Sequence, residues 1–204
     1  MTSARERILD AYERQLVELG ERGSTLDAIA VEAGVSKGGL LYHFKSKDDL
    51  AAGLIARLTE RGAADLAGFP DTAEQAIHHF IVAASDVDDP LGASYLATQV
   101  LARAGRPDAF AALQDLEEGW YRAILELTGD PVVARLMQLV SDGIYYNAAV
   151  VPEGSPPTAS GFTLVPLGDE REAIIARLLS LLPPGLGGGG LSEGGLGEGG
   201  QRGQ

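Results

Sequence analysis

The amino-acid sequence predicts an all-α protein with a small N-terminal three-helix domain followed by a larger helical domain. Apolar residues recur every three or four positions along most of the chain, as in amphipathic helices. Glycine and proline separate these segments. Residues 1–47 are expected to form the first domain and residues 48–182 the second. The glycine-rich segment 183–204 is expected to be a disordered tail, because it cannot bury enough apolar surface to offset its ordering entropy.

Capping residues place the helices of the N-terminal part. Gly20 and Gly23 end the first helix, and Ser24 or Thr25 can cap the second. Gly34 supplies a tight turn, and Ser36 can cap a third helix. Ser46 can cap a fourth. The expected helices are residues 4–20, 26–33, 37–44, and a segment from about 47 into the 60s.

Prolines separate the helices expected in the second domain. These prolines are Pro70, Pro90, Pro107 and Pro131. The expected helices are about 72–86, 91–104, 107–128, 131–149 and 169–182. Residues 151–168 contain four prolines and three glycines, so they are expected to form a loop.

The composition is that of a soluble cytoplasmic protein. There is no cysteine, which excludes disulfides and thiolate metal sites. The charged N-terminus has no apolar signal-peptide core, and no run approaches the roughly 18 apolar residues of a membrane span. We therefore expect no membrane association.

The charge distribution points to one positively charged surface on an acidic molecule. The net charge is -13, which taken alone argues against binding to nucleic acid. Residues 1–61, however, hold 9 Lys and Arg against 10 Asp and Glu. The three lysines of the chain, Lys37, Lys45 and Lys47, all lie in the acid-free window 33–47. This window favours a local contact with phosphate.

Residues 25–50 have the organisation of a helix-turn-helix. Two short helices joined by Ala33-Gly34-Val35-Ser36 can pack on the preceding helix. The second helix of such a pair enters the DNA major groove, which is about 12 Å wide. Small residues at its start allow a close approach of the backbone, and Ser36 with the exposed amides can bind phosphate. The segment therefore predicts DNA binding.

The run AGVSKGGLLYHFKSKDDL resembles the signature of the TetR family of bacterial regulators. The resemblance covers about residues 5–55. It implies backbone phosphate contacts by Thr25, Lys37, Tyr42, His43 and Lys47, and base contacts near Gly38 and Gly39. Many members have Thr or Ser in place of Gly39 and Tyr in place of Leu41. This chain therefore has fewer hydroxyls with which to recognise bases.

The resemblance also implies a homodimer that binds an inverted-repeat operator and responds to a small-molecule effector. Apolar stripes on the helices at 131–149 and 169–182 can form the dimer interface, or they can face the core of their own subunit. The first stripe contains Val132, Leu136, Leu139, Val140, Gly143, Ile144 and Asn147, and the second contains Ile174, Leu178, Leu181 and Leu182.

A sensor needs a cavity between the middle helices that is mostly apolar, with a few polar groups. The ligand is expected to be hydrophobic or aromatic. A ligand that carries a carboxylate stays open as an alternative, because Arg103 and Arg106 lie between Arg61 and Arg122. Candidate lining residues are His78, Tyr95, Gln99, Trp120, Tyr121, Asp142, Tyr145 and Tyr146, together with Phe80 and Phe110.

No catalytic or metal-binding pattern occurs in the sequence. His78 and His79 are adjacent, so on a helix their side chains diverge by about 100°. Neither a nucleophile elbow nor a phosphate-binding loop is present. No enzyme activity, cofactor or metal is therefore expected.

Three alternatives to a ligand-responsive repressor stay open. One is an activator, another is a regulator that answers to a protein partner, and the third is an interaction module or enzyme that uses the helix-turn-helix as scaffold.

Overall fold

The computed structural model describes residues 3–85, 89–151, 155–158, 160 and 162–183. No strand occurs in these ranges, so the predicted all-α fold is confirmed. The helices are α1 (Ala4–Gly23), α2 (Leu26–Glu32), α3 (Lys37–His43), α4 (Lys47–Ala67), α5 (Ala73–Ala83), α6 (Pro90–Arg103), α7 (Pro107–Thr128), α8 (Pro131–Val150) and α9 (Gly168–Leu179).

Side-chain caps begin the helices of the N-terminal part, as predicted. The hydroxyl oxygens of Thr25, Ser36 and Ser46 each accept a hydrogen bond from the backbone N–H three residues later, at 3.2, 3.0 and 3.1 Å. Each bond satisfies one of the free donors at a helix start. Gly20 and Gly34 have φ of 72° and 65°, which only glycine adopts without strain.

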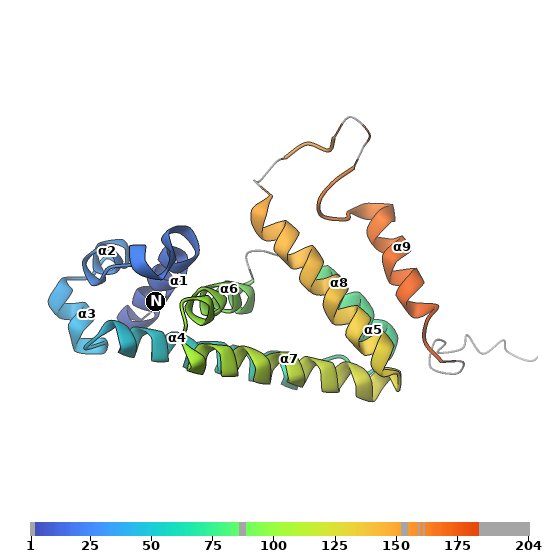
Figure 1. Cartoon of the computed structure of the whole chain (residues 1–204), viewed down its shortest axis with the longest axis horizontal. Coiled ribbons are helices and arrows are strands. Elements are labelled where there is room, and N and C mark those ends of the chain that lie inside the picture. The colour runs from blue at the N-terminus through green and yellow to red at the C-terminus, as the bar shows by residue number, and fades with distance from the viewer. Residues whose placement is uncertain (1–2, 86–88, 152–154, 159, 161, 184–204) are drawn as a thin grey trace, which may run out of the picture.

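The core of the N-terminal part continues into α6. Leu40 and Phe44 fix α3 against α1, and Leu50 and Leu54 add the start of α4. Two residues of α6, Ala97 and Leu101, belong to the same buried cluster. Figure 1 shows α6 between the α1–α3 end of the molecule and the remaining helices. A shift of α6 would therefore disturb the packing of the helix-turn-helix.

The long helices α4 and α7 lie along one another (Figure 1), and α6 packs against both of them. Helix α8 packs on α7 and on α5, and α9 packs on α5. The cluster that joins them includes Ile77 and Ile81 of α5, Met137 of α8 and Ile175 of α9. This arrangement leaves room between α4, α5, α6, α7 and α8 for the cavity described below.

Several helix ends differ from those expected. Helix α5 ends at Ala83, three residues before the expected 86, which itself lies outside the described residues. Helix α9 ends at Leu179, although Leu182 beyond it is still buried. The described parts of 151–167 contain no helix, as expected for a loop. The predicted glycine-rich tail lies outside the described residues from 184 onward. Within the described ranges no helix is long and apolar enough to span a membrane.

Candidate DNA-binding surface and ligand cavity

The outer face of α3 carries most of the predicted DNA-contacting residues. Thr25, Ser36, Lys37, Gly38, Tyr42 and His43 are exposed, and Gly39 and Lys47 are partly exposed. Tyr42 is 83% exposed, and its ring meets that of His43 edge to face at 5.2 Å. These residues are thus accessible at the start of α2, along α3 and at the start of α4.

The first turn of α3 is kept narrow by its glycines. A Cβ built on Gly39 would lie 3.3 Å from the Ser36 hydroxyl oxygen, and one built on Gly38 would meet nothing closer than 4.0 Å. Space at Gly38 is therefore open to an outside partner, whereas a side chain at Gly39 would press on the Ser36 cap.

Two of the three lysines form ion pairs within the surface. Lys37 Nζ lies 2.9 Å from Asp27 Oδ1 of α2, and Lys47 Nζ lies 3.0 Å from Glu21 Oε1 of α1. The Lys37–Asp27 pair is exposed, and pairs of this kind contribute about 0–1 kcal/mol. A phosphate can therefore displace the Asp27 carboxylate at small cost. The Lys47–Glu21 pair is more buried, and Lys47 also donates to the backbone oxygen of Glu21.

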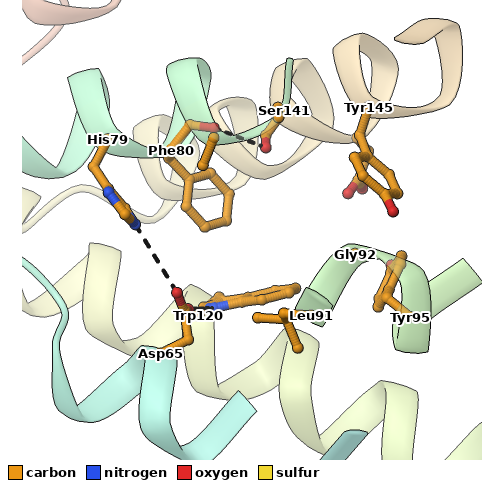
Figure 2. Close-up of a pocket in the computed structure, with 12 residues that line it drawn as sticks. Asp65, His79, Phe80, Leu91, Gly92, Tyr95, Trp120, Ser141 and Tyr145 are labelled. Atoms are coloured by element: carbon orange, nitrogen blue, oxygen red, sulfur yellow. Dashed lines mark hydrogen bonds and ion pairs between the residues drawn. The ribbon is translucent and has the colours of Figure 1, made fainter. Parts of the chain in front are cut away.

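A cavity lies between the five helices α4, α5, α6, α7 and α8. It contains about 570 Å³ not filled by atoms, part of it open to solvent. Figure 2 shows Phe80, Ser141 and Tyr145 on one side, facing Trp120, Leu91 and Tyr95 on the other. The lining residues are Asp65, His79, Phe80, Ala83, Ala84, Leu91, Gly92, Tyr95, Trp120, Ser141, Asp142 and Tyr145.

The aromatic rings of the cavity wall contact one another. Phe80 lies edge to face with Trp120 at 5.7 Å, and Tyr95 lies 6.1 Å from Trp120 and 6.2 Å from Tyr145. The indole N–H of Trp120 donates to Asp65 at 2.7 Å. The missing side chain at Gly92 makes room for the Tyr145 ring. A Cβ at position 92 would lie 2.5 Å from the Tyr145 hydroxyl oxygen. That hydroxyl is buried and has no hydrogen-bond partner in the described part of the chain.

A polar wall separates this cavity from a wider one between α7 and α8. The Tyr95 hydroxyl donates to Glu117, and Gln138 Nε2 donates to the other Glu117 oxygen at 3.0 Å. Burial and the Glu117 charge raise the pKa of Tyr95, so its proton stays in place. Tyr95 and Asp142 line both cavities. Burial and the charge of Glu117 raise the pKa of Asp142 to about 6, while Arg135 opposes this shift.

Half of the predicted ligand residues line the first cavity, namely Tyr95, Trp120, Asp142 and Tyr145. Tyr121 and Phe110 line the wider cavity, and Phe80 lines the first. His78 is exposed and its neighbour His79 is the cavity residue. The side chains of Gln99 and Tyr146 hydrogen-bond to each other and line neither cavity.

The sequence interpretation named neither Asp65, Gly92 nor Ser141. Each is a single small or acidic residue on a helix, and no motif distinguishes it. Only the packing of α4, α6 and α8 brings them to the cavity.

A buried ionic network ties α1, α4 and α6 together, and the sequence interpretation missed it. Glu13 of α1 accepts hydrogen bonds from Arg57 at 3.0 Å, from Arg61 at 3.3 Å and from the Ser94 hydroxyl at 2.5 Å. Arg61 also donates to the backbone oxygen of Pro90 at 2.6 Å. Glu13 and Arg57 are each only 5% exposed.

Arg57 also forms ion pairs with two further carboxylates of α1. It donates to Asp10 at 2.8 Å and to Glu6 at 2.5 Å. Burial alone would lower the pKa of Arg57, but Glu13, Asp10 and Glu6 outweigh burial and raise it. The guanidinium therefore stays charged, and α4 is held against α1 along two turns.

Helix α8 leaves an apolar stripe uncovered. Val132, Leu136, Leu139 and Gly143 are exposed at spacings of three to four residues. Val140 and Asn147 are partly buried and Ile144 is buried. On α9 and just beyond its end the pattern is reversed. Ile174 and Leu178 of α9 and Leu182 after it pack within their own subunit, and Leu181 is exposed.

Metal binding has no evident site in the structure. Among the described residues, no three His, Asp or Glu side chains are close enough together to hold a metal ion.

The comparisons with known proteins agree with this architecture. Residues 8–54 match the family model for bacterial regulatory proteins of the tetR family. A curated relative, the HTH-type transcriptional repressor BepR of Brucella suis biovar 1, is 43% identical over 53 residues, which are 26% of this chain and 25% of BepR. The match thus spans about a quarter of that relative.

Solved structures extend the similarity to the whole fold. A TetR-family member from Streptomyces coelicolor A3 superposes with a TM-score of 0.60 at 22% identity, covering 89% of this chain and 99% of its own. The multidrug binding protein EbrR, complexed with malachite green, gives 0.58 at 24% identity over 88% and 98%. NalD, a repressor of Pseudomonas aeruginosa, gives 0.58 at 16% identity over 89% and 97%. Residues 8–54 therefore match the tetR family model, as the helix-turn-helix predicted, and most of the chain shares the fold of these solved structures.

Proposed function

We propose that the chain is a dimeric transcription regulator that binds operator DNA through α3 and is released by a small hydrophobic or aromatic ligand. The main support for DNA binding is the exposed surface of α3, which lies within the residues that match the family model, 8–54. Repression is the proposed sign, because the curated relative BepR is a repressor.

DNA binding follows from the shape and charge of α3. Its first turn presents Lys37 and Gly38 without bulky neighbours, so the backbone can approach base edges in the major groove. Tyr42 and His43 are exposed and Lys47 is partly exposed, so their side chains are free to donate to backbone phosphates. The surface is small, so one copy would bind weakly.

Dimerisation supplies the missing affinity. The exposed stripe of Val132, Leu136, Leu139 and Gly143 on α8 can pack against a second copy, and Gly143 permits a close helix approach. Two copies then present two α3 helices to half-sites about one DNA turn apart, which is why the operator is expected to be an inverted repeat.

The cavity is the proposed ligand site, and α6 is the proposed connection to the DNA surface. Leu91, Gly92 and Tyr95 of α6 line the cavity. Pro90 and Ser94 on the same turns are bonded to Arg61 and Glu13. A ligand that moves α6 shifts α1 and α4 with it. Couplings between such sites are typically about 1–3 kcal/mol. EbrR, which has the same fold, is complexed with malachite green.

The test is a gel shift of the purified protein with DNA from beside its own gene, titrated with salt. We expect a specific shift with dimer stoichiometry that weakens steeply as salt rises. Lys37→Ala should weaken the shift, whereas Arg122→Ala on α7 loses the same charge away from α3 and should not. Turnover of a substrate without salt-dependent DNA binding would instead favour an enzyme that uses the helix-turn-helix as scaffold.

A further inference from the structure

The cavity combines aromatic rings with negative charge. Four rings form much of its wall, and Asp65 and Asp142 are its two carboxylates. Among the described residues that line it, none is a lysine or arginine, and His79, whose Nε2 lies 4.0 Å from Asp65 Oδ1, is the one basic side chain.

The two carboxylates differ in their hydrogen-bond and ion-pair partners. Asp65 accepts a hydrogen bond from the Trp120 indole N–H at 2.7 Å and lies beside His79. Asp142 receives no hydrogen bond and forms no ion pair within the part of the chain that the structure describes. Partial burial disfavours the charged form of Asp142, and a cation beside it would oppose that effect.

The surroundings of Asp142 make the local field more negative still. Glu117, bonded to Tyr95 and Gln138, acts on Asp142 from α7, and only Arg135 opposes it from α8. The wider cavity on the other side of Asp142 is lined by Glu117, Glu118 and Arg135 as its charged groups besides Asp142. Both sides of Asp142 therefore favour a cation.

We propose that the ligand of this cavity is a small lipophilic organic cation, held with its charge beside Asp142 and against the aromatic rings of Tyr95 and Tyr145. The proposal rests on the proposed function, in which this cavity holds the effector. Asp142 and Tyr145 lie one turn apart on α8, and the Tyr95 and Tyr145 rings lie edge to face at 6.2 Å. Aromatic rings attract cations through their negative faces.

Other ligand classes fit less well. An anion would meet two carboxylates and no fixed cation. A neutral aromatic molecule would fill the space but leave Asp142 without a partner. A cation supplies that partner, and one that carries an N–H group could also donate to the buried Tyr145 hydroxyl, which now bonds to nothing in the described structure.

The test compares a cation with a neutral molecule of the same shape. Phenyltrimethylammonium and tert-butylbenzene differ in charge but hardly in size. The single tryptophan, Trp120, lines the cavity and reports binding of either compound by fluorescence. We expect the full-length protein to bind the cation at least about tenfold more tightly than the neutral compound.

Asp142→Asn should remove most of that preference and leave affinity for tert-butylbenzene within about twofold. Retained binding of the neutral compound also shows that the variant is folded. Asp115→Asn removes the same charge from an exposed position on α7 that lines neither cavity. Its preference for the cation should be unchanged.

Two results would overturn the inference. Equal or tighter binding of tert-butylbenzene would mean a neutral ligand, while the cavity would still serve the proposed function. Binding of neither compound to a protein that still shifts operator DNA would reject this ligand class. Failure of the proposed function itself would appear separately, as the absence of a specific DNA shift.

Discussion

Replacing Glu13 by Gln should destabilise the whole N-terminal half of the molecule, because Glu13 joins three helices. Its carboxylate accepts three hydrogen bonds, from Arg57, Arg61 and Ser94. Hydrogen bonds to charged groups contribute about 1.5–3 kcal/mol each. Glutamine keeps one oxygen acceptor, and Arg57 keeps Asp10 and Glu6, so part of the loss is compensated. We expect the free energy of unfolding to fall by about 2–3 kcal/mol.

Urea denaturation followed by circular dichroism measures this change. The matched control is Glu18→Gln, which makes the same chemical change at an exposed position of α1 and should alter stability by less than about 0.5 kcal/mol. A loss in Glu13→Gln no greater than in the control would refute the reasoning. A double-mutant cycle with Ser94→Ala should give a coupling of at least about 0.5 kcal/mol if Glu13 and Ser94 interact directly.

Four further predictions concern the cavity, the dimer and the DNA surface. Gly92→Ala places a Cβ 2.5 Å from the Tyr145 hydroxyl, so it should cost about 1–3 kcal/mol and weaken phenyltrimethylammonium binding, measured by Trp120 fluorescence; unchanged affinity would contradict it. Affinity for that cation should rise with pH through about 6, as Asp142 loses its proton. Asp65, His79, Tyr95, Glu117, Arg135 and Tyr145 face the same space, and any pH dependence left in Asp142→Asn belongs to one of them. Leu139→Glu should yield a monomer in analytical ultracentrifugation, and a persisting dimer would place the interface elsewhere than on the α8 stripe. Asp27→Asn frees Lys37 from its 2.9 Å ion pair and should tighten operator binding about two- to fivefold at low salt; weaker binding in the gel shift would show that Asp27 positions Lys37 for DNA.

The sequence predicted the helix-turn-helix closely because its signals are local. Each cap acts on a backbone N–H three residues away, and Gly34 needs only its own φ. The family resemblance added contact roles for α3 residues. Their common exposure agrees with those roles, which stay predictions until DNA binding is measured.

The cavity was predicted less completely because it depends on how distant helices pack. Aromatic residues on long helices are visible in sequence, so Tyr95, Trp120 and Tyr145 were found. Neighbouring residues on a helix point about 100° apart, so the orientation of the helix decides whether His78 or His79 faces the cavity. The sequence pattern does not determine that orientation. Gln99 was assigned to the cavity only because of the helix on which it lies. Nothing in the sequence indicated its hydrogen bond to Tyr146.

The ionic network was also beyond sequence-based prediction, because its partners are far apart in the sequence. Glu6, Asp10 and Glu13 recur at helical spacing on α1, so an acidic stripe is evident in the sequence. Their shared partner Arg57 lies 44 residues beyond Glu13, and no local pattern connects them. A solvated acidic face would show the same spacing. Only the burial of Glu13 and Arg57 distinguishes a structural network from that face.

The modest charge of the DNA surface bears on how a ligand could release it. Lys37 and Lys47 are already paired with Asp27 and Glu21, so operator phosphates must compete with carboxylates of the same chain. The rest of the molecule is strongly acidic and adds repulsion. We infer that operator affinity depends on both α3 helices of a dimer binding together. Under that condition a coupling of about 1–3 kcal/mol, transmitted through α6 and Glu13, would lower operator affinity by about five- to 150-fold. On the proposed mechanism, a small movement of the two α3 helices out of register with their half-sites would therefore be enough for release.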